Sequence, residues 1–234
     1  MRYTASRRPV RLPKRVRKLQ RQLSIPPYPK LGRPGFVGSA VHAWNGLIHT
    51  VVHQRNMRVH VLAAVAVSLV GSGIPLGLAE KVTLIFCVLL VFFAEILNSA
   101  LEQLVDLATQ EFDEKAKIAK DAAAAGVLVL AIGTVVIFSA IVFHNRETIA
   151  AFQRMVLRQM ALGFPLLGCA ALLMMKRPRP RWFDAVVFAV ACVLMAIIAR
   201  NTYSSVFTAI MIGLMVVNGA AARERQKLNR QPRG

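Results

Sequence analysis

Residues 82–106 read VTLIFCVLLVFFAEILNSALEQLVD, an uncharged apolar run that continues into polar side chains without a glycine or proline. At about 100° per residue, four of these side chains fall within one face of a helix. They are Glu95, Asn98, Glu102 and Asp106. A carboxylate in hydrocarbon costs about 2.5–3.5 kcal/mol on insertion scales, so such a line predicts a buried functional face. The alternative is a helix that leaves the membrane near residue 95 and ends in a solvated acidic segment.

The composition of the whole chain is that of a membrane protein. Of its 234 residues, 56% are hydrophobic and the mean hydropathy is +0.50, which is too apolar for an ordinary soluble domain. We therefore expect an all-α integral membrane protein. Six stretches reach or approach the roughly 20 residues that cross a bilayer. They are residues 57–79, 82–108, 122–143, 155–175, 183–199 and 203–222.

The net charge of +19 follows the order of these stretches along the chain. Of the 30 Lys and Arg residues, 13 precede residue 59, three lie in 115–120, four in 176–181 and five after residue 222. These 25 residues fall on one side of an alternating six-span topology, and the positive-inside rule places that side, with both termini, in the cytoplasm. The basic excess is thus explained by topology and by attraction to anionic lipid, and not by nucleic acid.

The segment before the first stretch has two parts. Residues 1–35 are basic and proline-rich, and they predict either a short amphipathic helix on the membrane surface or a disordered tail. Residues 36–53 carry an apolar face with helical period and predict an interfacial helix. His49 and His53 on its polar face are four residues apart and could hold a metal, although histidines are also typical of the wet side of such a helix.

Acidic residues gather again after the second stretch, in a predicted loop over residues 108–119. Lys120 and Asp121 then stand at the mouth of the third stretch. Acids suit a divalent cation, a lysine suits a phosphate, and a glutamate at hydrocarbon depth could deprotonate a hydroxyl. This set favours phosphoryl transfer at a membrane interface, although neither of the common phosphate loops occurs in the sequence. An intramembrane cation transporter is the alternative, but a pore has no evident use for Lys120 and Asp121.

Four motifs resemble those of a known family, the small bacterial integral-membrane lipid kinases that comprise prokaryotic diacylglycerol kinase and undecaprenol kinase. The motifs are WNGL at 44–47, RNMRVH at 55–60, EILNSALE at 95–102 with Asp106, and KIAKD at 117–121. The resemblance covers roughly residues 36–145. It implies a homotrimer of three-span protomers in the bacterial inner membrane, each with a surface helix. The implied reaction transfers the γ-phosphoryl group of ATP, with Mg²⁺, to the hydroxyl of diacylglycerol or undecaprenol.

The resemblance also implies roles for individual residues. Glu95 would be the catalytic base, Asn98 would orient it, and Glu102 would bind the metal. The residues that would contact the nucleotide are His42, Glu111, Phe112, Asp113, Lys120 and Asp121. Gln54 would be the second metal-binding residue, but the family has a glutamate there, so a catalytically inactive scaffold of the same fold stays an alternative.

Three segments follow from these observations. Residues 1–35 form a basic N-terminal tail, residues 36–145 a membrane lipid kinase domain, and residues 146–234 a three-span extension with a basic tail. The extension lies outside the resemblance and repeats none of its motifs.

Overall fold

The computed structural model describes residues 35–109, 111–175 and 179–228, and within these ranges it contains helices and no strand. The predicted all-α class is confirmed. The question of a surface helix within residues 1–35 falls almost wholly outside the described residues. The chain divides into two compact units, Met1–Val41 and His42–Gly234.

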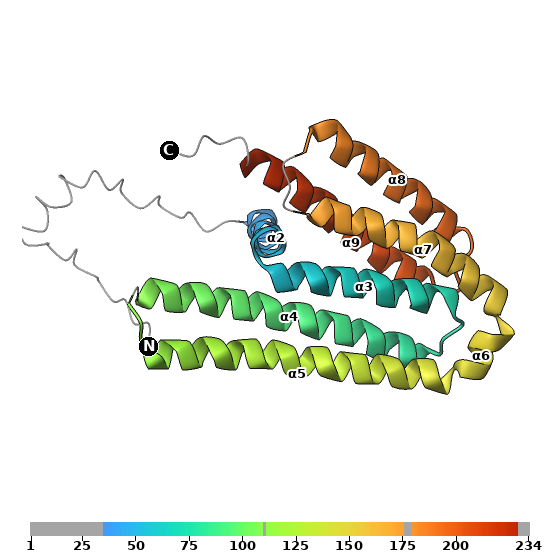
Figure 1. Cartoon of the computed structure of the whole chain (residues 1–234), viewed down its shortest axis with the longest axis horizontal. Coiled ribbons are helices and arrows are strands. Elements are labelled where there is room, and N and C mark those ends of the chain that lie inside the picture. The colour runs from blue at the N-terminus through green and yellow to red at the C-terminus, as the bar shows by residue number, and fades with distance from the viewer. Residues whose placement is uncertain (1–34, 110, 176–178, 229–234) are drawn as a thin grey trace, which may run out of the picture. The chain divides into compact units, whose positions relative to one another are not determined.

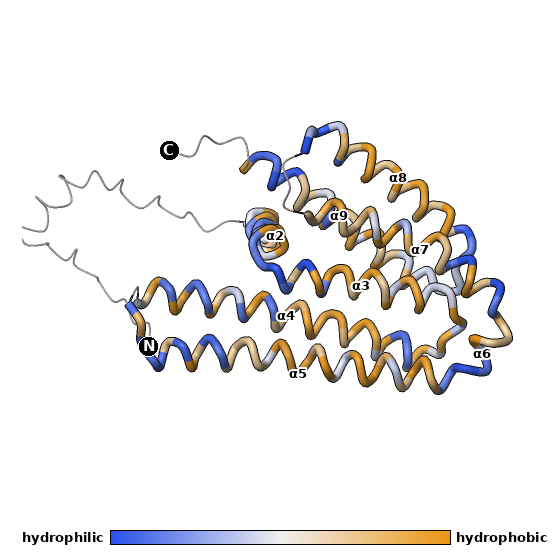
Figure 2. Tube along the Cα trace, in the orientation of Figure 1, coloured by the Kyte–Doolittle hydropathy of each residue, from blue (hydrophilic) through white to orange (hydrophobic). Residues whose placement is uncertain are grey.

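Helices account for most of the described chain (Figure 1). They are α2 (Phe36–His53), α3 (Arg55–Gly73), α4 (Leu78–Ala108), α5 (Glu114–His144), α6 (Arg146–Ala151), α7 (Gln153–Met174), α8 (Arg181–Ala199) and α9 (Ser205–Leu228). All except α2 and α6 are long and apolar enough to cross a membrane, which confirms the six predicted spans. In Figure 2 hydrophobic residues fill most of α4 and α5, with hydrophilic residues toward the ends where the two helices connect. The protein is therefore a multi-pass membrane protein.

Two elements differ from the sequence prediction. The predicted loop over residues 108–119 is wrong in its second half, because α5 begins at Glu114. Asp113 is the N-cap of α5, and its Oδ1 accepts the backbone N–H of Ala116 at 2.9 Å. Such a cap satisfies a donor that a helix start leaves unpaired, so the helix begins before its apolar run. The short helix α6 was not predicted, because six residues carry too little periodicity to identify it.

Within the second unit, α3 packs more extensively on α7 and α9 than on α4, whereas α4 packs along α5. The extension also closes the end of α3. The backbone oxygen of Ser72 accepts the N–H of Tyr203 at 2.9 Å and the hydroxyl of Thr202 at 3.1 Å. The predicted domain boundary between residues 145 and 146 stays a prediction. Helix α3, which lies before this boundary, packs on α7 and α9, which lie after it.

Helix α5 is the least covered of the spans. Val127 is its one buried residue among those described, and α5 as a whole packs on α4 and, at its end, on α6. Its exposed apolar side chains include Leu128, Val129, Ile132, Val135 and Val136. A continuous apolar face of this kind is stable only against lipid or another protein surface.

Candidate active site

The polar side chains of α4 form a face whose burial decreases along the helix. Glu95 and Asn98 are 1% and 4% exposed, Glu102 is half-buried, and Asp106 is exposed. The face therefore runs from the protein interior to water. Such a gradient allows an apolar ligand and a water-soluble ligand to reach the same face.

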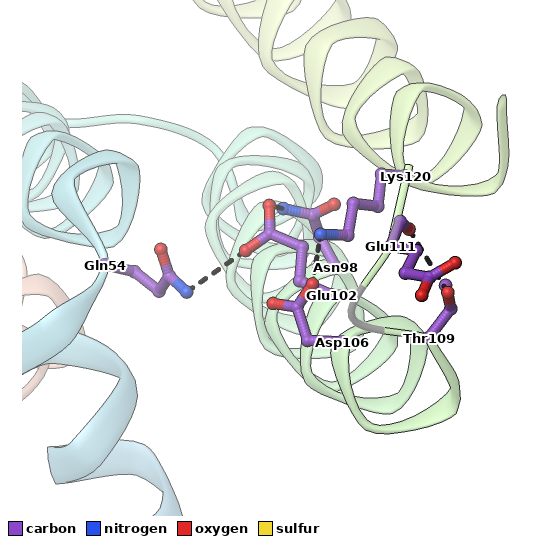
Figure 3. A network of polar contacts seen from close by, with 7 residues as sticks. All are labelled: Gln54, Asn98, Glu102, Asp106, Thr109, Glu111 and Lys120. Carbon is purple, nitrogen blue, oxygen red and sulfur yellow. Dashed lines mark hydrogen bonds and ion pairs between the residues drawn. The ribbon is translucent and has the colours of Figure 1, made fainter. Parts of the chain in front are cut away.

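The start of α3 lies against this face. Gln54 is the N-cap residue of α3 and makes no capping bond with its side chain. Instead its Nε2 donates to Glu102 Oε2 at 3.2 Å, while Asn98 Nδ2 donates to Glu102 Oε1 at 3.3 Å (Figure 3). The backbone N–H of Met57, in the first turn of α3, faces the Glu95 carboxylate. Free N–H groups at a helix start favour nearby carboxylates, so the start of α3 favours the Glu95 carboxylate through its backbone and contacts Glu102 through the Gln54 side chain.

Three buried oxygens on α4 have no hydrogen-bond partner among the described residues. They are Glu95 Oε2, Asn98 Oδ1 and Ser99 Oγ. Buried polar atoms are normally paired, so a cluster of orphaned oxygens indicates a site that a substrate or ion completes. Ser99 was not among the predicted site residues. Ser99 lies four residues after Glu95, on the adjacent helical turn, and this spacing is the feature of the sequence that could have identified it.

Lys120 reaches from α5 to the outer end of the same face, where its Nζ forms an ion pair with Asp106 (Figure 3). Asp106 belonged to the predicted polar face but not to the predicted site residues. The structure thus brings Gln54, Glu102 and Lys120 around the exposed half of the α4 face. A carboxylate and an ammonium group at the water side are the groups that a metal–phosphate complex requires.

Other residues predicted to bind nucleotide are not joined to this face by a hydrogen bond within the described chain. They are His42 on α2, Glu111 and Phe112 in the connection, Asp113 at the cap and Asp121 on α5. All five are exposed. Their predicted roles stay predictions, and the carboxylate of Asp113 already serves the start of α5.

The histidine pair on α2 does not form a chelating arrangement. The rings of His49 and His53 stack with centroids 4.1 Å apart, and His53 Nδ1 contacts the His49 backbone oxygen at 3.0 Å. Partial burial, and then the charge of His53, lower the pKa of His49 below its usual value. Across the described residues no group of three or more His, Cys, Asp or Glu side chains is placed to hold a metal ion.

Comparison with known proteins gives matches in this part of the chain. A family model described as prokaryotic diacylglycerol kinase matches residues 41–142. A diacylglycerol kinase from Synechocystis sp. is 40% identical over 105 residues, which cover 44% of this chain and 60% of that relative. No solved structure matches the chain.

Two further relatives are matched over more of their length. An undecaprenol kinase from Bacillus subtilis is 39% identical over 97 residues, covering 42% of this chain and 79% of the relative. A diacylglycerol kinase from Escherichia coli K12 is 31% identical over 100 residues, covering 43% and 82%. All of the predicted site residues lie inside the matched region, and the chain belongs to the prokaryotic diacylglycerol kinase family.

Proposed function

We propose that this protein is a lipid kinase that transfers the γ-phosphoryl group of ATP to the hydroxyl of a membrane lipid, either diacylglycerol or undecaprenol. The observation that carries the proposal is the buried Glu95, whose Oε2 has no partner among the described residues, at the interior end of a face that opens to water. The names of the relatives, diacylglycerol kinase and undecaprenol kinase, support the same class of acceptor.

In this proposal Glu95 accepts the proton of the lipid hydroxyl as the oxygen attacks phosphorus. A carboxylate is suited to this step because its orphaned oxygen can receive a hydroxyl donor without first breaking a protein contact. Asn98 lies one turn away and is equally buried, so its amide restricts where Glu95 and the hydroxyl sit. Burial also keeps water from competing with the lipid for the phosphoryl group.

The residues at the exposed half of the face fit Mg²⁺. This ion takes oxygen ligands and is usually held by one or two carboxylates together with substrate phosphates, so a dense cluster of acids is not needed. Glu102 supplies the carboxylate, and the buried, unpartnered Oδ1 of Asn98 supplies a second oxygen nearby. Gln54 contacts Glu102 and carries a further amide oxygen. When bound, the ion would neutralise charge on the transferring phosphate.

Lys120 would meet the phosphates of ATP, with Asp106 holding its ammonium group at the α4 face until the nucleotide arrives. His42, Glu111, Phe112, Asp113 and Asp121 would complete the nucleotide site. We also propose that protomers associate as a homotrimer, which the exposed apolar side of α5 supports. The distribution of Lys and Arg supports a bacterial inner-membrane location with both termini in the cytoplasm.

The test is a phosphorylation assay with purified protein, labelled ATP, and diacylglycerol or undecaprenol in separate micelles. We expect labelled lipid in one of the two micelle preparations, and the lipid that is labelled faster is the substrate. Glu95→Gln should lower kcat by a factor of about 10² to 10⁴ while leaving ATP binding unchanged, because an amide cannot accept the proton. Glu147→Gln, an exposed carboxylate on α6, is the matched control and should be silent. Full turnover in Glu95→Gln would refute the assignment of the base, and absence of labelled lipid from both acceptors would refute the kinase.

A further inference from the structure

Three half-buried arginines from different parts of the second unit lie close together at one end of its helices. Arg58 is in the first turn of α3, Arg179 precedes α8, and Arg225 is in the last turn of α9. Arg179 and Arg225 both bond to backbone oxygens at the end of α7, and Met57, Met174 and Ala221, which lie near the three arginines in sequence, belong to one buried cluster. We call the three arginines the arginine cluster.

Each member of the cluster is held in place by contacts to the protein. Arg225 Nη1 donates to the Met175 backbone oxygen at 2.8 Å, and Arg179 Nη1 donates to the Leu172 oxygen at 3.2 Å. The Arg179 guanidinium also stacks on Phe183, 5.0 Å from the ring centroid. Arg58 Nη1 donates to the Val52 oxygen at 2.9 Å. The guanidinium groups are therefore ordered before any ligand binds, which lowers the entropy that binding must overcome.

Closing the ends of α2 and α7 is one use of these arginines, since the last carbonyls of a helix lack partners. That use does not account for the accumulation of charge. A guanidinium has five N–H donors, and with the further bonds from Arg179 to Met175 Sδ and from Arg225 to the Ala221 backbone oxygen, one or two are occupied on each arginine. Several donors on each side chain are left for another group.

The nearby negative charge does not balance the cluster. Asp184 is the acid whose charge acts on Arg225, and its Oδ2 accepts a hydrogen bond from Gln226 Nε2. Within the described part of the chain, none of the three arginines forms an ion pair with a carboxylate. Like charges held together in a half-buried site repel each other unless an anion joins them.

We propose that the arginine cluster is a binding site for a phosphate group, at the junction between α3 of the kinase domain and the three-helix extension. Arginine forks match phosphate oxygens in pairs, and cationic clusters at helix ends beside a membrane surface attract anionic lipid headgroups. The phosphate belongs either to the headgroup of an anionic lipid or to a free phosphate ion. The site is separate from Glu95 and Glu102 and does not depend on the proposed kinase activity.

The experiment follows thermal unfolding of the full chain in detergent micelles with added ligand at constant ionic strength. The probes are dihexanoyl phosphatidylglycerol, inorganic phosphate, and dihexanoyl phosphatidylcholine as the lipid without net charge. The unfolding temperature should rise to saturation with phosphatidylglycerol and not with phosphatidylcholine. A lipid headgroup site binds phosphatidylglycerol more tightly than inorganic phosphate, and a free-phosphate site does not.

Variants decide whether the effect belongs to the cluster. Arg179→Gln with Arg225→Gln should weaken the apparent affinity by about tenfold or more, since each removes a charge-assisted hydrogen bond. Arg154→Gln with Arg200→Gln removes the same charge from exposed positions at the opposite helix ends and should leave affinity unchanged. Asp184→Asn removes the competing carboxylate and should tighten binding, a gain that misfolding cannot produce.

The proposal is overturned if no anionic probe stabilises the natural protein to saturation. It is also overturned if both double variants bind as the natural protein does, or if Asp184→Asn leaves the affinity unchanged.

Discussion

Replacing Gln54 by Glu would place a second carboxylate beside Glu102, where the natural amide donates a hydrogen bond of 3.2 Å. Two unit charges about 4 Å apart interact by about 4 kcal/mol at an effective dielectric constant near 20. Both side chains are half-buried, so water reduces the repulsion toward the roughly 1 kcal/mol typical of exposed pairs. We expect a net repulsion of about 2 kcal/mol, which corresponds to roughly a thirtyfold change in an equilibrium constant.

The sign of this effect reverses when a divalent cation is present. Without Mg²⁺, Gln54→Glu should lower the free energy of unfolding, because two carboxylates repel and one hydrogen bond is lost. With Mg²⁺, the added charge strengthens binding of the ion, so the unfolding temperature should recover. The concentration of Mg²⁺ that gives half-maximal activity should fall by about tenfold or more.

The assay titrates Mg²⁺ against both the unfolding temperature and the rate of lipid phosphorylation. Gln103→Glu is the matched control, since it adds the same charge at the neighbouring position of α4 on an exposed face. Equal responses in the two variants would refute the argument, because the effect would then come from net charge rather than from the contact with Glu102.

Three further predictions concern other parts of the molecule. Gly163→Leu should lower the free energy of unfolding by about 1–3 kcal/mol through overpacking between α7 and α3. Gly168→Leu on the same helix should not lower it, because an added Cβ there meets no described atom within 4 Å. Thermal unfolding in detergent compares the two variants. Asp106→Asn should change the free energy of unfolding by less than about 1 kcal/mol, since its ion pair with Lys120 is exposed. It should also lower the KM for ATP, because Lys120 becomes available to phosphate. Steady-state kinetics would show an unchanged KM if Lys120 does not contact the nucleotide. Because the pKa of His49 is lowered in the folded protein, the unfolded chain binds a proton at His49 at a higher pH than the folded protein does. The contribution of His49 to stability is therefore complete above the usual histidine pKa and is lost as pH falls through the lowered pKa. The unfolding temperatures at pH 5 and pH 7.5 should differ less in His49→Gln than in the natural protein.

Periodicity predicted the features that depend on one helix alone. Residues 36–53 became α2 with the same bounds, and Glu95, Asn98 and Glu102 share a face because 3.6-residue geometry requires it. The start of α5 was misplaced because the cap at Asp113 determines it, and a charged first turn resembles a loop in sequence. Contacts between distant helices, such as Gln54 with Glu102, have no local pattern and came from the family resemblance or from the structure.

The extension was the least predictable part, for a related reason. Its three long helices are mostly apolar, so the sequence predicts that they enter the membrane but not which span they pack against. The arginine cluster has no signature in the sequence, because its three members are separated by more than 40 residues in each interval. The meeting of α3, α7 and α9 brings them together, and no spacing rule describes it.

The close fit of Gly71 against Phe207 has a consequence for how this chain can change over generations. A Cβ at position 71 would come to 2.5 Å from the Phe207 ring, so α3 and α9 share one steric constraint. A larger residue at 71 requires a smaller one at 207, and neither position can drift independently. The residues permitted at position 71 of α3 are thus set by a side chain on α9 that lies more than 130 residues later in the chain.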